Sequence, residues 1–120
     1  MLSLVLAGGL ALPAAAQDAA AGQRVYNQCR ACHTIAEGGR NGVGPNLHGV
    51  VGRPAGAIEG FRYSTALRGK AAEGLVWDEA RLRAYITNPR AVIPGGAMTY
   101  PGLRSEQQMN DLIAYLKANG

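Results

Sequence analysis

The chain has 120 residues, which suits a single domain, and its 12 Lys and Arg against 8 Asp and Glu give a formal net charge of +4. This modest basic excess is spread along the chain and forms no dense stripe with interleaved aromatic residues, so we expect no nucleic-acid partner. The charge fits steering toward an acidic protein surface, although a solvated basic face without a partner would explain it equally well.

The first 16 residues are predicted to be a signal peptide. They are apolar and end in small residues, so that cleavage after Ala16 would leave Gln17 as the first mature residue. No Lys or Arg precedes the apolar run, which makes the n-region atypical, and the run is shorter than the ~20 residues of a membrane-spanning helix. We therefore expect an exported, periplasmic protein whose mature domain, residues 17–120, is soluble and has no membrane span.

The first predicted helix spans residues 18–30, with Asp18 as its N-cap. It ends in a C-x-x-C-H sequence formed by Cys29, Cys32 and His33, which is the attachment pattern of c-type haem. Two thiols three positions apart at a helix end lie on nearly one face, so both can form thioethers to the vinyl groups of one porphyrin. The imidazole that follows them can then serve as an axial ligand of the iron.

Three other interpretations of the two cysteines are weaker. A thioredoxin-like motif would follow a strand in a βαβ unit, and the sequence contains no such pattern. A zinc site would need a second pair of ligands, whereas only His48 remains. A plain disulfide, common in exported proteins, would give His33 no role. We therefore predict one covalent haem c on Cys29 and Cys32, with His33 bound to its iron.

Residues 34–60 contain ten Gly or Pro and no predicted element. A structureless loop longer than about 15 residues is uncommon in a compact domain and is usually functional. The domain is also poor in large apolar side chains, because aromatic residues make up only 6% of the sequence. A buried haem would give this loop an apolar surface to fold against and would supply the missing core.

Three further helices are predicted after this loop, at residues 64–69, 78–88 and 105–118. Their predicted N-caps are Ser64, Asp78 and Ser105. The last two helices carry apolar stripes at helical spacing. These stripes consist of Leu82, Tyr85 and Ile86 in one helix and of Met109, Leu112, Ile113 and Leu116 in the other.

The sixth position of the iron has three candidate side chains, besides water or an open site. Met109 lies in the apolar stripe of the last predicted helix, where core packing explains it. His48 lies in a Gly-rich loop, where a surface or hydrogen-bonded histidine is the simpler explanation. Met98 ends the sequence PGGAM between two helices and has no stripe to join. We favour Met98, because ligation would explain an apolar residue there, and a Met ligand opposite His raises the reduction potential of a haem iron.

Over residues 22–116 the chain resembles class I cytochrome c, of the small bacterial type similar to mitochondrial cytochrome c. The resemblance rests on the haem motif, the P-G-x-x-M loop and the closing helix in this order, together with GPNLHG at residues 44–49. It implies an all-α fold of about four helices with long loops wrapped around one haem. It also implies a monomeric carrier of single electrons in a respiratory or related periplasmic chain, and not an enzyme.

The resemblance implies roles for individual residues. The backbone carbonyl of Pro45 would accept the Nδ1 proton of His33 and fix the imidazole ring. Gly22 would let the first helix cross closely over the last.

Further implied roles concern the haem itself. Arg53, Tyr63 and Trp77 would hydrogen-bond the buried haem propionates, because a buried charge needs such donors. Tyr85 would place its hydroxyl near the sulfur of Met98. From the pattern alone, plain core packing would explain the three aromatic residues.

Two departures from the family pattern affect the expected hydrogen bonding on the propionate side and the expected partner surface, respectively. Leu67 stands where mitochondrial relatives carry an Asn of the haem–water network, and Gly96 and Ala97 replace the polar and basic residues usual before the methionine. A basic ring around the exposed haem edge would therefore rely on four arginines: Arg90 and Arg104, with Arg30 and Arg40. We expect membrane or periplasmic redox proteins, as electron donor and acceptor, to dock near Arg90 and Arg104.

Two other functions remain open from the sequence. A haem enzyme or gas sensor would need an open or labile sixth position and a distal acid–base residue. A dedicated subunit of one dehydrogenase or oxidase complex would bind a single acidic partner tightly. The sequence names neither the donor nor the acceptor, and it does not fix the reduction potential.

Overall fold

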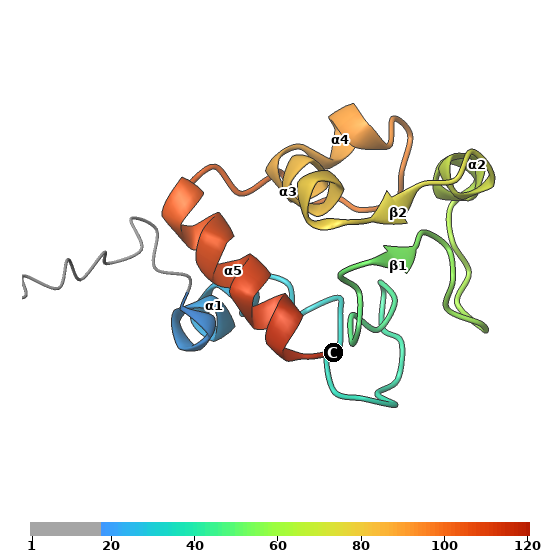
Figure 1. Cartoon of the computed structure of the whole chain (residues 1–120). Coiled ribbons are helices and arrows are strands. Elements are labelled where there is room, and N and C mark those ends of the chain that lie inside the picture. The colour runs from blue at the N-terminus through green and yellow to red at the C-terminus, as the bar shows by residue number, and fades with distance from the viewer. Residues whose placement is uncertain (1–17) are drawn as a thin grey trace, which may run out of the picture.

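Helices dominate the computed structural model, which describes residues 18–120 (Figure 1). The predicted signal peptide at residues 1–16 lies outside the described residues. The elements are α1 (Ala19–Tyr26), β1 (Arg53–Pro54), α2 (Thr65–Ala72), β2 (Val76–Trp77), α3 (Glu79–Thr87), α4 (Pro89–Val92) and α5 (Glu106–Ala118). The all-α prediction is confirmed, with one addition: β1 and β2 pair antiparallel, and each is too short to leave an alternating pattern in the sequence.

The four predicted helix starts are confirmed, because each predicted N-cap side chain accepts a hydrogen bond from the first turn. Asp18, Ser64, Asp78 and Ser105 accept from the N–H groups of Ala20, Leu67, Arg81 and Gln108, respectively.

The predicted helix ends are less accurate. The helix α1 ends at Tyr26 instead of Arg30, and turns continue the chain to Cys32. The helix α2 continues past Gly69 and ends at Ala72, two residues before Gly74. The φ of +91° at Gly74 is typical of the residue that follows the C-cap of a helix. The short helix α4 was not predicted; it begins with Pro89, whose fixed φ favours the first helical position.

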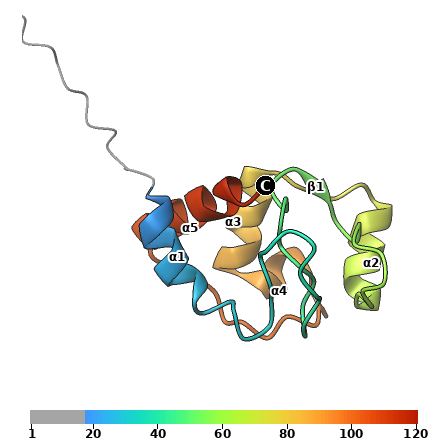
Figure 2. The ribbon, with the colours of Figure 1, turned by 90° about the horizontal axis from the view of Figure 1, so that it is seen from below.

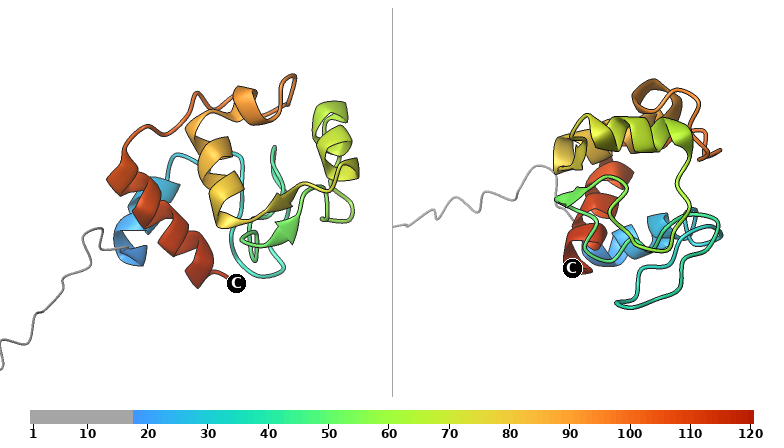
Figure 3. Two further views of the ribbon diagram at one scale, coloured as in Figure 1. Left: turned by 45° about the horizontal axis from the view of Figure 1, so that its top comes forward. Right: turned by 90° about the vertical axis from the view of Figure 1, so that its right-hand side faces the viewer.

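The two helices α1 and α5, far apart in the sequence, cross in contact with each other (Figure 3). Gly22 lies at the crossing, where an added Cβ would collide with the backbone carbonyl of Asp111 and lie 2.8 Å from the Cβ of Tyr115. The rings of Tyr26 and Tyr115 pack beside it with their centroids 5.3 Å apart. The close approach expected at Gly22 is therefore present, and the apolar stripe of α5 is buried as predicted.

The helix α3 joins this pair to the rest of the domain. Arg83 donates to Asn110 of α5 at 2.8 Å, and Lys117 of α5 pairs with Glu79 of α3. In Figures 1 and 2, α3 and α4 lie between the α1–α5 pair and the more distant α2. No helix among residues 18–120 combines the length and the apolar character needed to cross a membrane.

The long loop after the haem motif is organised by its own side chains. Asn46, only 7% exposed, donates through its amide to the hydroxyl of Thr34 at 2.8 Å and to the carbonyl of Ala36 at 2.9 Å. Its backbone N–H in turn donates to the side-chain oxygen of Asn41 at 2.8 Å. These bonds fold residues 34–46 back on themselves and bring Pro45 beside His33.

Candidate functional site

A cavity of about 420 Å³ lies inside the ring formed by the loops, α3 and α5. Its wall includes the side chains of Cys29, Cys32, His33 and Met98. The remaining lining is mostly apolar and comes from both loops and helices. Its members include Leu47, Val50, Leu67, Leu82, Ile86, Ile93, Leu112 and Leu116.

The two cysteines share one wall because the turns after α1 keep helix-like hydrogen bonds. The N–H of Cys29 donates to the carbonyl of Tyr26 at 2.8 Å, and the N–H of His33 donates to the carbonyl of Cys29 at 2.9 Å. The two thiols are free and are not joined to each other. Burial, followed by the nearby Cys32, raises the pKa of the Cys29 thiol above its usual value, which keeps it protonated at neutral pH.

The imidazole of His33 is held from several sides. Its Nδ1 lies 2.7 Å from the carbonyl oxygen of Pro45, which can only accept, so Nδ1 carries the proton. An added Cβ on Gly44 would lie 2.7 Å from Nδ1, so only glycine leaves room for the ring there. Burial lowers the pKa of His33, which favours the neutral ring. Its Nε2 is then left with a free lone pair on the cavity wall.

The backbone of the same residue is fixed by a contact that the sequence analysis missed. The hydroxyl of Tyr26 donates to the carbonyl oxygen of His33 at 3.0 Å. Burial is the largest cause that raises the pKa of Tyr26 to about 12, so the hydroxyl remains a donor at neutral pH.

The structure separates the three side chains considered for the sixth position. Met98 lines the cavity, whereas neither His48 nor Met109 is among the described residues that line it. Met109 is 4% exposed and belongs to the hydrophobic core, as predicted. The Nδ1 atom of His48 is buried and has no hydrogen-bond partner among the described residues.

The side chains expected near the haem are Arg53, Tyr63 and Trp77 at the propionates and Tyr85 near Met98, and they divide into two groups. Tyr63 and Tyr85 line the cavity, whereas Arg53 and Trp77 are not among its described lining residues. The guanidinium of Arg53 donates to the carbonyl of His48 at 3.2 Å. Trp77 is 6% exposed and packs on Tyr85 with ring centroids 4.8 Å apart. Burial lowers the pKa of Arg53 and raises that of Tyr85.

Gln28, Phe61 and Tyr100 also line the cavity, and neither Gln28 nor Tyr100 was singled out from the sequence. Phe61 packs edge to face on Tyr63 with ring centroids 4.8 Å apart. The hydroxyl of Tyr100 donates to the side-chain oxygen of Gln28 at 3.0 Å, across 72 positions of sequence. No periodicity or motif indicates this pair, although Gln28 precedes the first cysteine and Tyr100 follows Met98 by two residues.

The donor set and the cavity fit an iron porphyrin. Two thiols and one neutral imidazole lie along one wall, a thioether is available on the lining, and the space between is bounded mainly by apolar side chains. Thiols can bind the porphyrin covalently, while imidazole and thioether sulfur are both haem-iron ligands. Among residues 18–120, no three His, Cys, Asp or Glu side chains gather as a metal cluster.

Comparisons with known proteins agree with this geometry. The family model described as Cytochrome c matches residues 19–119. Cytochrome c2 from Blastochloris viridis is 50% identical over 113 residues, which cover 94% of this chain and 86% of the relative. Cytochrome c2 from Rhodoblastus acidophilus is 49% identical over 108 residues, or 88% and 98% of the two chains. The solved structure of cytochrome cH from Methylobacterium extorquens superposes with a TM-score of 0.76 at 42% identity, covering 84% of this chain and 98% of that one.

Proposed function

Because the chain belongs to the cytochrome c family, and is thus a monohaem electron-transfer protein with covalently attached haem c, we propose which residues hold the haem and where partners bind. Cys29 and Cys32 would bind the haem through thioethers, and Nε2 of His33 and the sulfur of Met98 would be the ligands of its iron. The observation that carries this proposal is the apolar cavity whose lining includes all four side chains.

When bound, the haem supplies an iron that takes up and releases one electron. Pro45 keeps the proton of His33 on Nδ1 and so reserves Nε2 for the metal. Met98 as the partner of His33 raises the reduction potential, because a thioether is a weak donor that favours the reduced iron. The apolar lining excludes water, and His33 and Met98 would leave the iron no site for an outside ligand. Little therefore has to rearrange when the charge changes, and the chain acts as a carrier and not as an enzyme.

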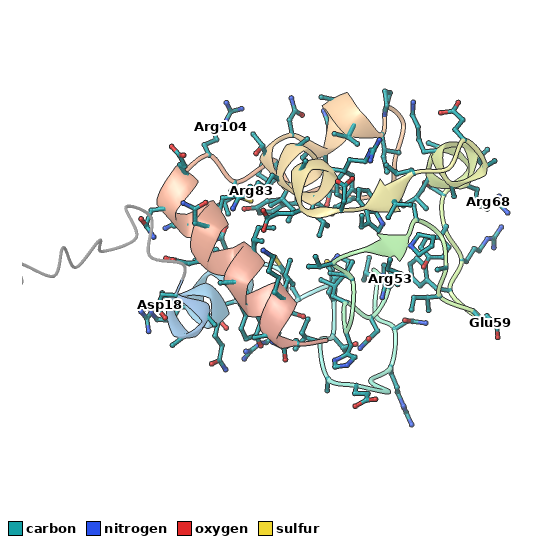
Figure 4. The ribbon with its side chains drawn as sticks, in the orientation of Figure 1. Asp18, Arg53, Glu59, Arg68, Arg83 and Arg104 are labelled. Carbon is teal, nitrogen blue, oxygen red and sulfur yellow. The ribbon has the colours of Figure 1, made fainter. Side chains whose placement is uncertain are left out.

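Partner proteins dock, in this proposal, at the edge of the cavity near Arg90 and Arg104. These two residues flank the segment that carries Met98, one on α4 and the other just before α5, and both are exposed. Neither takes part in an ion pair among residues 18–120. Figure 4 shows Arg104 pointing away from the body of the molecule. Both cations are thus available to an acidic partner surface.

Two exposed residues extend this surface. Arg30 and Arg40 lie in the segments next to the cavity wall, and Val43 on the wall itself is 81% exposed. An apolar centre with a basic rim suits brief docking of electron donors and acceptors, either membrane-bound or periplasmic. The periplasmic location itself follows from the signal peptide proposed at residues 1–16, and the mature carrier is proposed to be a monomer.

The decisive experiment is a spectrum of the purified holoprotein with two methionine variants. The wild type should show a Met–iron charge-transfer band in the near-infrared and, when reduced, should not bind carbon monoxide. Met98→Ala should abolish the band and lower the reduction potential. Met109→Leu is the matched control, because a volume-conserving change in the core should leave the band in place.

Each outcome has a distinct meaning. An unchanged band in Met98→Ala would refute the ligand assignment. High-spin iron that binds carbon monoxide in the wild type would instead support an enzyme or gas sensor with an open sixth position.

A further inference from the structure

The segment of residues 97–101 has few attachments to the rest of the domain. All five of its residues line the cavity, and Met98 is one of them. Backbone hydrogen bonds hold the chain only on either side of it, from Gly96 to Ile93 at 3.0 Å and from Leu103 to Ile86 at 2.9 Å. Between them, the hydrogen bond from Tyr100 to Gln28 is the only one that ties residues 97–101 to another described segment.

The other end of this hydrogen bond is firmly anchored. The N–H of Gln28 donates to the carbonyl of Val25 at 3.2 Å, and the next residue, Cys29, donates to Tyr26 at 2.8 Å. Gln28 is thus part of the turns that continue α1 and carry the first thiol. The Tyr100 hydroxyl therefore joins the loosely held methionine segment to the wall that bears both cysteines.

We propose that Gln28 and Tyr100 form a latch that holds residues 97–101 closed over the cavity, and that both are positioning residues for Met98. This inference rests on the function proposed above, in which Met98 binds the iron. Segments with few hydrogen bonds of their own open locally at low free energy, without global unfolding. Breaking the latch therefore makes the sulfur of Met98 easier for an external ligand to displace, while the fold persists.

The test is displacement of Met98 by imidazole in the ferric holoprotein, followed by loss of the near-infrared band at fixed pH. Tyr100→Phe and Gln28→Ala should each raise the apparent imidazole affinity about 2- to 12-fold, the range that one net hydrogen bond supplies. The double variant should gain no more than either single variant, because both remove the same bond.

Two further variants separate the hydrogen bond from other effects. Gln28→Glu keeps an acceptor for the Tyr100 hydroxyl, so its imidazole affinity should stay at or below that of the wild type. Gln23→Ala removes an exposed glutamine of α1 outside the cavity and should change nothing. In guanidinium unfolding of the holoprotein, each latch variant should keep a single cooperative transition, and its free energy of unfolding should fall by no more than the free energy of imidazole binding improves.

Wild-type imidazole affinity in both single variants, or additive effects in the double variant, would overturn the latch. Absence of the near-infrared band in the wild type would instead refute Met98 as ligand. In that case amide hydrogen exchange of Gly96 and Leu103 in the holoprotein, whose N–H groups are hydrogen-bonded on either side of the segment, still reports on the latch. Exchange should accelerate by the same factor in Tyr100→Phe, and unchanged exchange would count against it.

Discussion

The α1–α5 crossing and the cavity wall formed by residues 27–63 and 93–104 are held together in different ways. At the crossing, the chain supplies its own apolar contacts: Leu112, Ile113 and Leu116 are at most 3% exposed. Along the wall, Cys32 and the tip residue Val43 remain exposed, and the loop is organised by polar bonds around Asn46. The crossing is therefore a complete helix interface, whereas the wall lacks an apolar partner of its own.

This difference indicates which part of the fold depends on the cofactor for its stability. Leu112 and Leu116 belong to the core cluster and also line the cavity, so α5 has one partner in α1 and a second in the cavity contents. A haem packed there would extend the helix interface into the loops. The effect of a substitution in the wall should therefore be measured on haem retention or the haem spectrum. The effect of a substitution at the crossing should be measured on the free energy of unfolding.

The largest effect is expected from the double variant Cys29→Ala/Cys32→Ala, which removes the covalent tether from the wall. Its haem should be extractable with acid acetone, whereas the wild-type haem should stay with the polypeptide. Once the haem is lost, the mostly apolar lining of the cavity loses its packing partner and meets water, which removes a large share of the small net stability of a domain. Thermal unfolding followed by circular dichroism should then lose its cooperative transition.

The single variant Cys29→Ala is the matched control, because it leaves one thioether. Its haem should still resist extraction. A colourless wild-type polypeptide, or a cooperative transition of unchanged midpoint in the extracted double variant, would remove the distinction between the two regions.

The two regions also differ in how far the sequence predicts them. The helix starts and the stripe of α5 follow from local signals, capping residues and a 3.6-residue period, which act within one element. The haem motif is a local signal as well. The hydrogen bond from Tyr26 reaches the backbone carbonyl of His33, and the one from Tyr100 reaches the side chain of Gln28. In both cases the two partners meet only in the folded chain. No local pattern encodes such contacts, so the sequence could not predict them.

The next effect concerns the crossing itself. Gly22→Ala places a methyl group against the carbonyl of Asp111, which cannot move without shifting α5. We expect a loss of about 2–3 kcal/mol in the free energy of unfolding, measured with guanidinium on the holoprotein. The near-infrared band should persist, because the cavity wall is untouched.

Gly69→Ala serves as the control for this change. An added Cβ there has no neighbour within 4 Å, and the residue lies inside α2, so the variant should gain about 0.5–1 kcal/mol. Equal effects at both glycines would show that the crossing is not sterically tight.

A smaller effect links the crossing to the wall through Tyr26. Tyr26→Phe keeps the ring beside Tyr115 but leaves the carbonyl of His33 without its donor, which should cost about 1–1.5 kcal/mol. The folded pKa of Tyr26, about 12, lies above the ordinary tyrosine value of 10.0. The stabilisation is therefore present below pH 10 and is lost as the pH rises toward 12.

Guanidinium unfolding at several pH values tests both parts of this prediction. The difference between the wild type and Tyr26→Phe should shrink between pH 10 and 12. Tyr115→Phe removes a hydroxyl for which the described structure gives no hydrogen bond, and its difference from the wild type should stay small. A constant difference for Tyr26→Phe would mean that the hydroxyl does not act through the bond to His33.

The smallest effect is expected at the surface pair that ties α3 to α5. The hydrogen bond from Lys117 is the largest cause that lowers the pKa of Glu79, so the folded pKa lies below the unfolded one. The pair therefore stabilises the protein at neutral pH, and its contribution is lost as the pH falls through the acidic range in which Glu79 takes up a proton.

Both side chains are partly exposed and screened, so Lys117→Met should cost only about 0.2–1 kcal/mol at pH 7. Lys70→Met, which breaks a pair between α2 and its C-cap residue Glu73, should cost less, because that pair joins no two elements. If Lys117→Met cost several kcal/mol, the pair would outweigh the apolar packing, and the crossing would no longer stand as a region held by burial.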